Sequence, residues 1–340
     1  MNVLYSSDEN YVKYAMVSIC SLLENNKELD AINIYFICNS ISETSKNKLQ
    51  QIIHGFNRKL IFIDKDEIDI SFIKQSEFSR SGYYRLFASD VIKEDRVLYI
   101  DCDTVILDSL KDLWETDIDG YILAGVRDTV EDFNAGAVGL RDNSEYINSG
   151  MMLYNLKKMR EIHFTEQVID CFHLYNGYVP HHDQGVVNYI ARGKILYLPV
   201  RYNLMSQYLL FTPEQLKKLF HIRKLYSDEE VDYAKKHPAI VHFLNKFYGR
   251  PWEEGCENPF RKQFLAYSEK YEINIEMSKK IITSKSRRVE LRKNAYRHLP
   301  FAAFYLIETI LYYHRKSAFR KAYAVVNFDE KKDSHENTNY

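Results

Sequence analysis

The sequence predicts an α/β fold in which a mixed, mostly parallel sheet is flanked by helices. Strand-like and helix-like segments alternate along the first third of the chain, which is the pattern of a parallel sheet with crossover helices. The strand-like segments are short, apolar and rich in β-branched residues, as expected of strands buried on both faces. Of the 340 residues, 46% are hydrophobic and 27% are charged, so the chain is globular and can bury a large core.

The elements of this alternation follow from local patterns. Apolar side chains at Val12, Ala15, Met16 and Ile19 recur at helical spacing, and Ser42 fits the N-cap of a second helix. In chain order we expect a strand at 2–7, a helix at 11–26, a strand at 31–39, a helix at 42–56, a strand at 58–64, a helix at 81–92 and a strand at 96–101.

The pattern loosens after this last strand. Further along the chain we expect strands at 121–128 and 146–156, a single helix at 157–175, and strands at 194–203 and 239–244. From about residue 270 onwards the chain is expected to be helical and basic, and the polar run at 326–340 is expected to be disordered.

Composition excludes several classes of protein. The net charge is −1, which provides no global field for nucleic acid, so no nucleic-acid partner is expected. The five cysteines form no CxxC pair, as in a reduced cytosolic protein. The first residues lack an export signal, and no apolar run is long enough to span a membrane. Neither a GxGxxG nor a GxxxxGK[ST] phosphate loop is present.

Two carboxylates stand at the end of a predicted buried strand, in the segment RVLYIDCDTVIL at residues 96–107. Ligands of open parallel sheets bind beyond the carboxyl ends of the strands, and Asp101 stands at that end. Asp101 and Asp103 are separated by one residue, so an extended backbone would place both on one face. Their mutual repulsion calls for a cation, and oxygen ligands suit Mg²⁺ or Mn²⁺. The motif is short, and two aspartates in a solvated loop are an equal alternative.

Further polar residues accompany later predicted elements. Asn148 lies beside a buried strand, Asp183 and Gln184 lie at the start of a helix, and His242 follows a strand. The imidazole of His242 could complete a metal shell with the two aspartates, and a core or capping histidine is the alternative.

Together these segments resemble those of the family 8 glycosyltransferases, which are retaining enzymes with the GT-A fold. The matching motifs come in the order of the family, over roughly residues 1–260: YSSDENYVKYAMVSICSLL, YYRL, VLYIDCDTVIL, INSGMMLYNL, HHDQGVVN and VHF…RPW. The resemblance implies a GT-A catalytic domain at 1–265 and a UDP-sugar donor, either UDP-glucose or UDP-galactose.

The resemblance also implies how the nucleotide is held. The residues that correspond to the family's uracil and ribose ligands are Ser7, Asp8 and Asn10, and Arg85 corresponds to an arginine that contacts the donor. The two aspartates and His242 correspond to the ligands of Mn²⁺, or of Mg²⁺ in its place. That metal would bridge the diphosphate oxygens and act as a Lewis acid.

The donor sugar is assigned to a second group of residues by the same resemblance. Its hydroxyls correspond to Asp128, Asn148 and Asp183, and Gln184 corresponds to the residue beside the anomeric carbon. An amide is a poor nucleophile, so retention is expected to pass through an oxocarbenium-like species, with the acceptor attacking from the side of the leaving group. A nucleophilic Asp183 is the alternative.

One departure from the family concerns the diphosphate. The family often has histidine, glycine and then Lys-Pro-Trp, whereas this chain has HFLNKFYGRPW at residues 242–252. Arg250 stands in place of the lysine and can bind a phosphate with two hydrogen bonds. Lys246 is the alternative ligand.

A basic helical extension is expected at residues 266–325. Basic residues flank an aromatic-rich stretch from Leu299 to Tyr313, which is too short to span a bilayer and contains Glu308. An interfacial helix on an anionic membrane is expected, with lipid-linked acceptors at that surface, and a helical cap on the catalytic domain is the alternative. The protein is therefore predicted to be cytoplasmic and peripheral at the inner face of the plasma membrane.

The predicted function is metal-dependent transfer of glucose or galactose to a glycan or glycolipid, in the synthesis of bacterial lipooligosaccharide or another surface polysaccharide. Asp101 and Asp103 also fit the DxDx[TV] opening of haloacid-dehalogenase-like phosphatases, in which the first aspartate is phosphorylated. That motif normally lies on an early strand with a second aspartate pair downstream, and no convincing pair follows in this sequence. A non-catalytic scaffold that binds UDP-sugars or membranes is a third hypothesis.

Overall fold

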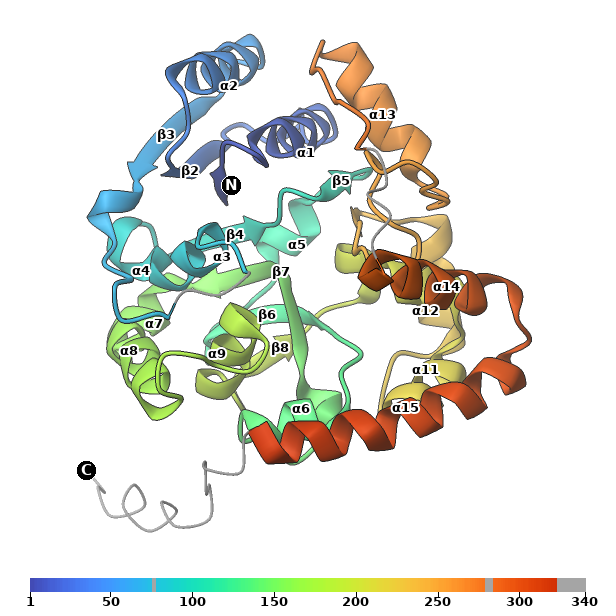
Figure 1. Cartoon of the computed structure of the whole chain (residues 1–340). Helices are drawn as coiled ribbons and strands as arrows, with labels where there is room; N and C mark the ends of the chain where they lie inside the picture. The colour runs from blue at the N-terminus through green and yellow to red at the C-terminus, as the bar shows by residue number, and fades with distance from the viewer. Residues whose placement is uncertain (75–77, 279–283, 323–340) are drawn as a thin grey trace, which may run out of the picture.

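The structure is a computed structural model, and it describes residues 1–74, 78–278 and 284–322. Its centre is a seven-stranded sheet of order β3-β2-β1-β4-β7-β6-β8, and a three-stranded sheet has the order β5-β10-β9 (Figure 1). The strands are β1 (Asn2–Asp8), β2 (Asn33–Asn39), β3 (Lys59–Asp64), β4 (Arg96–Ile100), β5 (Thr104–Ile106), β6 (Leu123–Arg127), β7 (Ile147–Asn155), β8 (Ile195–Tyr197), β9 (Leu204–Met205) and β10 (Ile240–His242).

The larger sheet is mostly parallel, as the sequence predicts. β7 is the exception, because it runs antiparallel to both of its neighbours, β4 and β6. The beginning of β7 therefore lies against the end of β4, where the Asp101 N–H donates to the Gly150 carbonyl oxygen at 2.8 Å. This reversal brings the polar residues of β7 to the same edge of the sheet as the aspartate pair.

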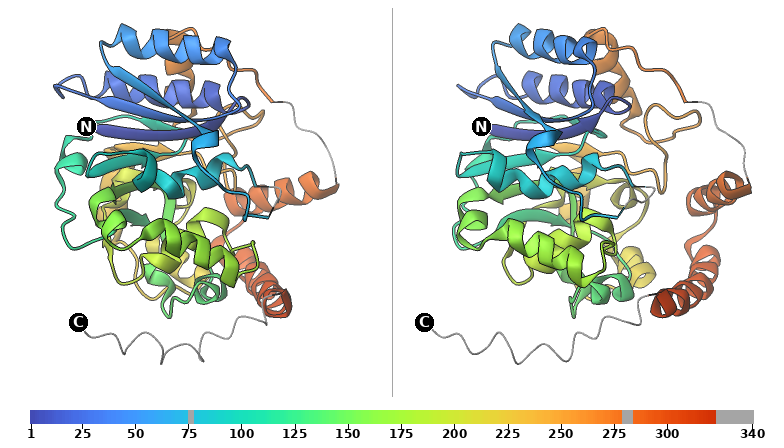
Figure 2. Two further views of the ribbon diagram at one scale, coloured as in Figure 1. Left: turned by 90° about the vertical axis from the view of Figure 1, so that its left-hand side faces the viewer. Right: turned by 60° about the vertical axis from the view of Figure 1, so that its left-hand side comes forward.

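Helices cover both faces of the sheet (Figure 2). One hydrophobic core includes α1 and α2, and a second includes α7, α8 and α9. The α-helices are α1 (Val12–Glu24), α2 (Glu43–Gly55), α3 (Ser81–Tyr84), α4 (Ala88–Val91), α5 (Lys111–Glu115), α6 (Asp132–Ala137), α7 (Leu156–Glu161), α8 (Phe164–Leu174), α9 (His182–Ile190), α10 (Ser206–Leu210), α11 (Pro213–Phe220), α12 (Asp228–Lys236), α13 (Arg261–Lys270), α14 (Ser284–His298) and α15 (Phe301–Ala322).

Several expected elements differ from the structure. The helix expected at 81–92 is divided into α3 and α4 by a short 3₁₀ helix (Arg85–Phe87), and residues 273–278, in the stretch expected to be helical, belong to no helix. The single helix expected at 157–175 is wrong, because His163 adopts a left-handed backbone (φ 53°) and separates α7 from α8. The strand expected at 194–203 is confined to β8, because the chain continues after Pro199 as a short 3₁₀ helix (Val200–Asn203).

The described part of the chain ends in α14 and α15, which we call the C-terminal helix pair. Aromatic side chains hold it to the main body, since Tyr296 and Phe304 pack against Phe211, and Tyr296 also packs against Phe247. The domain boundary proposed at residue 265 falls within α13, and the tail expected at 326–340 lies outside the described residues.

Buried Glu308 ties α15 to α14. Its carboxylate accepts hydrogen bonds from Arg292 Nε at 2.7 Å and from the Tyr296 hydroxyl at 2.9 Å, and Arg315 Nη2 lies 3.4 Å away. Burial alone would raise the pKa of Glu308, but these partners, Arg292 foremost, outweigh it and hold the pKa below its usual value.

Replacing Glu308 with glutamine is expected to lower the free energy of unfolding by about 2 kcal/mol at neutral pH, because Arg292 loses its buried counter-charge. A carboxylate with a depressed folded pKa contributes stability that is complete above its unfolded pKa of about 4.3 and is lost as the pH falls through the folded value. The difference between wild type and variant should therefore shrink on acidification. Urea denaturation at neutral pH and near pH 3 measures both values, and an unchanged difference in acid would contradict this role.

Candidate active site

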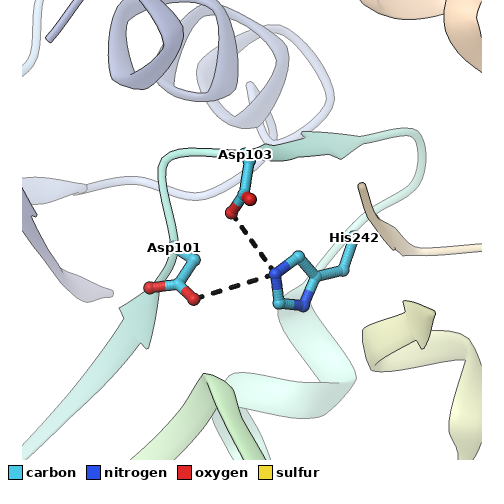
Figure 3. Close-up of side chains that lie close together, drawn as sticks. All are labelled: Asp101, Asp103 and His242. Carbon is cyan, nitrogen blue, oxygen red and sulfur yellow. Dashed lines mark ion pairs between the residues drawn. The ribbon is translucent and has the colours of Figure 1, made fainter. Parts of the chain in front are cut away.

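Three possible metal ligands from distant parts of the chain meet at the end of β4 (Figure 3). β4 ends at Ile100, and the chain turns through Asp101 and Asp103 into β5, which pairs antiparallel with β10. That pairing sets His242 opposite Thr104, next to the turn. His242 Nε2 lies 3.3 Å from Asp103 Oδ1 and 3.7 Å from Asp101 Oδ2. The three possible ligand atoms lie within 4.8 Å of one another, so they can share one cation. We call the group of Asp101, Asp103 and His242 the metal cluster.

The charges around the cluster favour the ionised form of Asp103. Burial alone would raise the pKa of Asp103, but the charge and hydrogen bond of His242, followed by the charge of Arg250, lower it to about 2. For His242, burial alone would lower the pKa, but the neighbouring carboxylates, Asp103 foremost, raise it above its usual value. Asp101 is paired with Arg85, whose Nη1 lies 2.9 Å from Oδ1. Two carboxylates and one imidazole are a donor set that suits Mn²⁺ or Mg²⁺.

The ring of His242 is oriented from behind by Asn203. His242 Nδ1 lies 3.0 Å from Asn203 Oδ1, and an amide oxygen only accepts, so Nδ1 donates and Nε2 is left to face the aspartates. On another side the ring packs against Gly150, where a Cβ would lie 2.2 Å from His242 Cε1. The direction of Nε2 therefore depends on the residue types at both positions.

A cavity of about 380 Å³ lies in front of the metal cluster. Asp8, at the end of β1, caps the turn into α1, because its Oδ1 accepts the N–H groups of Asn10 at 3.0 Å and Tyr11 at 3.3 Å. Its Oδ2 accepts the Ser79 hydroxyl at 2.9 Å. The residues that line the cavity are Ser6, Ser7, Asp8, Tyr11, Phe78, Ser79, Ser81, Gly82, Arg85, Tyr99, Asp101, Cys102, Asp103 and Arg250.

Only one of the two basic residues expected to bind the diphosphate, Arg250 and Lys246, lies at this cavity. Arg250 lines it, with Nε 3.3 Å from Asp103 Oδ2 and Nη1 donating to the Tyr11 hydroxyl. Lys246 instead lines a separate small cavity beside the C-terminal helix pair, and its Nζ lies 4.5 Å from the centre of the Phe220 ring.

A buried polar network adjoins the metal cluster. Asp128 Oδ2 accepts from the amide nitrogens of Asn148 and Gln184, both at 3.1 Å, and Oδ1 accepts from Gln207 Nε2 at 3.2 Å. Gln184 Oε1 in turn accepts from Asn148 Nδ2 at 3.1 Å. Asn148 Oδ1 accepts from Asn203 Nδ2 at 3.0 Å, which joins this network to the support of His242. Such connected amides hold one another in fixed orientations.

Asp183 lies across Arg85 from the metal cluster. Its Oδ2 lies 3.4 Å from Arg85 Nε, while Arg85 Nη1 contacts Asp101, so one buried guanidinium bridges two carboxylates. Burial raises the pKa of Asp183 even though Arg85 opposes this effect. Asp183 is therefore engaged by a cation of the protein itself.

The turn before α9 aims Asp183 and Gln184 inward. His181 and His182 both adopt left-handed backbone conformations, with φ of 59° and 57°, which is uncommon for non-glycine residues. Gly185 follows so closely on this turn that a Cβ there would lie 1.9 Å from the Pro180 carbonyl oxygen. Strain of this kind typically accompanies functional sites.

The structure brings together most of the site residues that the sequence predicts, with one exception besides Lys246. Asn10 does not line the cavity, and its backbone N–H donates to the Asp8 carboxylate. The other predicted site residues outside the cavity lining belong to the adjoining clusters: Asp128, Asn148, Asp183, Gln184 and His242. Sequence reasoning missed Asn203 and Gln207, which stand in no recognisable motif. Their signal in the sequence is slight: Asn203, Ser206 and Gln207 interrupt an otherwise apolar stretch at residues 202–211.

The chain matches a known protein family. The sequence model described as Glycosyl transferase family 8 matches residues 2–256. The chain is similar to General stress protein A of Bacillus subtilis (strain 168), with 27% identity over 273 residues that cover 78% of this chain and 92% of the relative. It is also similar to the lipopolysaccharide 1,2-glucosyltransferase of Escherichia coli K12, with 26% identity over 288 residues that cover 80% of this chain and 84% of the relative.

Solved structures share the fold. The crystal structure of the galactosyltransferase LgtC in complex with donor and acceptor sugar analogues matches with a TM-score of 0.67 at 20% identity, covering 85% of this chain and 100% of that one. The glycosyltransferase GlyE of Streptococcus pneumoniae TIGR4 matches with a TM-score of 0.55 at 22% identity, covering 78% of this chain and 60% of that one. The GT-A fold predicted from the sequence is confirmed by these matches.

Proposed function

This chain belongs to glycosyltransferase family 8, and from that premise we propose that it transfers glucose or galactose from a UDP-sugar to a glycan or glycolipid, with retention of the anomeric configuration. The observation that carries the proposal is the meeting of Asp101, Asp103 and His242 beside a cavity lined by Asp8 and Arg250. Such a site combines ligands for a cation, an acceptor for a nucleobase and a cation for a phosphate.

The diphosphate end of the donor would bind at the metal cluster. Mn²⁺ or Mg²⁺ held by the two aspartates and His242 would act as a Lewis acid towards the departing diphosphate. Arg250 is within reach of the same place, and its planar guanidinium can give a phosphate two parallel hydrogen bonds. Arg85 holds Asp101 and so keeps one metal ligand in position.

The nucleoside would bind at the other end of the cavity. Asp8 Oδ1 accepts two backbone N–H groups, and Oδ2 accepts the Ser79 hydroxyl at 2.9 Å and the Ser81 hydroxyl at 3.4 Å. A uracil N–H would take the place of the long bond from Ser81. Ser7 offers a hydroxyl nearby, and Tyr11 lines the cavity with a ring on which a base can stack.

The sugar would lie against the network of Asp128, Asn148 and Gln184. In the transfer, the bond between the anomeric carbon and the diphosphate oxygen breaks while the acceptor hydroxyl forms a new bond on the same face. The acceptor proton passes to a diphosphate oxygen. Gln184 is held at both ends of its amide, so it can orient its dipole towards developing positive charge without acting as a nucleophile. The engagement of Asp183 by Arg85 supports a positioning role for that residue in preference to covalent catalysis.

The acceptor is proposed to be a bacterial surface glycan, such as lipooligosaccharide or another cell-wall polymer. A relative named as a lipopolysaccharide glucosyltransferase supports this class, as does the fold shared with a galactosyltransferase that binds donor and acceptor sugar analogues.

A screen of nucleotide sugars tests the function. We expect the purified protein to release UDP from UDP-glucose or UDP-galactose in the presence of Mn²⁺, and proton NMR of the glycoside product should show the anomeric configuration of the donor. Release of phosphate from phosphate esters without attack on UDP-sugars would favour the phosphatase hypothesis. Binding of UDP without turnover of any donor would favour the scaffold hypothesis.

We also propose that α15 seats the protein on an anionic membrane, in keeping with a cytoplasmic enzyme at the inner face of the plasma membrane. None of the described helices combines the length and the apolar composition needed to cross a bilayer. α15 nevertheless exposes Leu306, Ile310 and Tyr313 on one side, each more than 60% exposed, with basic residues before and after it in the sequence. This combination suits an interfacial helix.

Replacing Leu306 and Ile310 together with serine is expected to lower binding to vesicles of phosphatidylcholine and phosphatidylglycerol at least about tenfold, because two exposed apolar side chains that would insert into the bilayer are lost. Flotation on a density gradient measures the bound fraction. Leu174→Ser, at an exposed leucine on α8, is the matched control. Undiminished flotation of the double variant would contradict the membrane proposal.

A further inference from the structure

The C-terminal helix pair packs against segments that carry the proposed catalytic residues. On α15, the Tyr312 hydroxyl and Lys316 Nζ each donate to the carboxylate of Asp132 at 2.7 Å, and Arg315 Nη2 lies 3.2 Å from Glu131 Oε1. Glu131 and Asp132 form the start of α6, which lies beside α15 in Figure 1. One side of α15 is therefore apolar and exposed, while the other is fixed by ion pairs to the main body.

The start of α6 follows directly on Asp128 in the chain. The residues between Asp128 and Glu131 are buried, and the Asn143 amide holds the Val130 carbonyl oxygen at 2.9 Å. A displacement of Glu131 would therefore reach Asp128, whose carboxylate orients Gln184. In this way the inner side of α15 supports the part of the site proposed to hold the donor sugar.

α14 reaches the segment on the other side of the site. Lys293 Nζ donates to Asn245 Oδ1 and lies 3.9 Å from Glu253 Oε2. The same carboxylate oxygen accepts the Arg250 N–H at 3.2 Å, which closes a turn that begins at Gly249 with a φ of +79°. α14 therefore supports the backbone from which Arg250 projects towards the metal cluster.

We propose that the C-terminal helix pair is part of the catalytic apparatus, with Lys316 positioning the sugar side of the donor site and Lys293 positioning its diphosphate side. Both are positioning residues, because they act through Asp132 and Glu253 and do not line the cavity. The inference rests on the proposed function, since it assigns the two contacts to two parts of a UDP-hexose. It assigns the extension a role in donor binding in addition to membrane attachment.

Binding of two ligands to full-length protein separates the two contacts. Lys316→Gln is expected to raise the dissociation constant of UDP-hexose about threefold to fivefold, the range of a half-buried ion pair, and to leave that of UDP almost unchanged. Lys293→Gln is expected to raise the dissociation constants of UDP and of UDP-hexose by the same factor, because both ligands carry the diphosphate. Isothermal titration calorimetry with Mn²⁺ present gives all four constants.

Two further variants control for a general loss of structure. His314→Gln changes an exposed residue on α15 and should leave both constants unchanged. The charge swap Lys316→Glu with Asp132→Lys should restore the affinity for UDP-hexose relative to Lys316→Glu alone. The positioning role of Lys316 is overturned if Lys316→Gln raises the dissociation constants of UDP and UDP-hexose equally or raises neither. The positioning role of Lys293 is overturned if Lys293→Gln raises neither constant. A wild-type protein that binds neither ligand would instead overturn the proposed function.

Discussion

Replacing Asp103 with asparagine is expected to lower metal-dependent release of UDP from a UDP-hexose at least about 1,000-fold, since Lewis-acid stabilisation contributes several kcal/mol and each 1.4 kcal/mol is a factor of ten. Asparagine keeps the shape of the side chain and removes its charge. Asp103 faces His242 Nε2 and Arg250 Nε, both at 3.3 Å, so the variant leaves two cationic or donor groups facing a neutral amide. The site then lacks the second carboxylate that a divalent cation requires.

Two measurements distinguish loss of the metal from loss of the fold. Titration of Mn²⁺ followed by electron paramagnetic resonance should show that Asp103→Asn binds the ion far more weakly than the wild type, and far-UV circular dichroism should show an unchanged fold. Asp112→Asn, at an exposed aspartate on α5, should keep both metal affinity and turnover. Full activity of Asp103→Asn in Mn²⁺ would refute the metal site.

The sequence alone predicts the three residues of the proposed metal site better than it predicts their surroundings. Asp101 and Asp103 are recognisable because they follow an apolar strand directly, and the family motifs supply His242. The orienting partner Asn203 is not recognisable in the same way, because it lies in a 3₁₀ helix within a stretch whose apolar residues suggest a strand. Which residue supports a proposed ligand from behind depends on which segments meet in space. That information is spread over the whole fold and stands in no local motif.

The direction of a strand within the sheet is likewise difficult to predict from the sequence. β7 contains an apolar run like those of the parallel strands, and composition reads the same in both directions along a strand. The reversal of β7 nevertheless decides that Asn148 and Gly150 lie beside Asp101. The choice between Lys246 and Arg250 also required the structure, because both follow His242 closely and only the turn at Gly249 directs Arg250 into the cavity.

Gly150→Ala is expected to lower metal affinity about 10- to 100-fold without changing any ligand, which is the usual range for loss of a group that orients a metal-binding histidine. The added Cβ would lie 2.2 Å from His242 Cε1, 2.7 Å from His242 Nδ1 and 2.9 Å from Asn148 Oδ1. The ring is buried between Asn203 and Asp103, so it can yield only by giving up one of these partners. Overpacking of a buried site should also lower the free energy of unfolding by about 1–3 kcal/mol.

A double variant tests whether the clash with His242 is the cause. If it is, Gly150→Ala should cost less stability in the His242→Ala background than in the wild type, because truncation of the ring removes two of the three close contacts and leaves the one to Asn148 Oδ1. Gly55→Ala, at a glycine with no atom near its added Cβ, is the matched control and should keep metal affinity and stability. Thermal denaturation and Mn²⁺ titration of the wild type, the two single variants and the double variant complete the cycle, with Gly55→Ala measured beside them. Stability costs that simply add in the double variant would show that the ring and the glycine do not interact, and the proposed orientation of Nε2 would then be wrong.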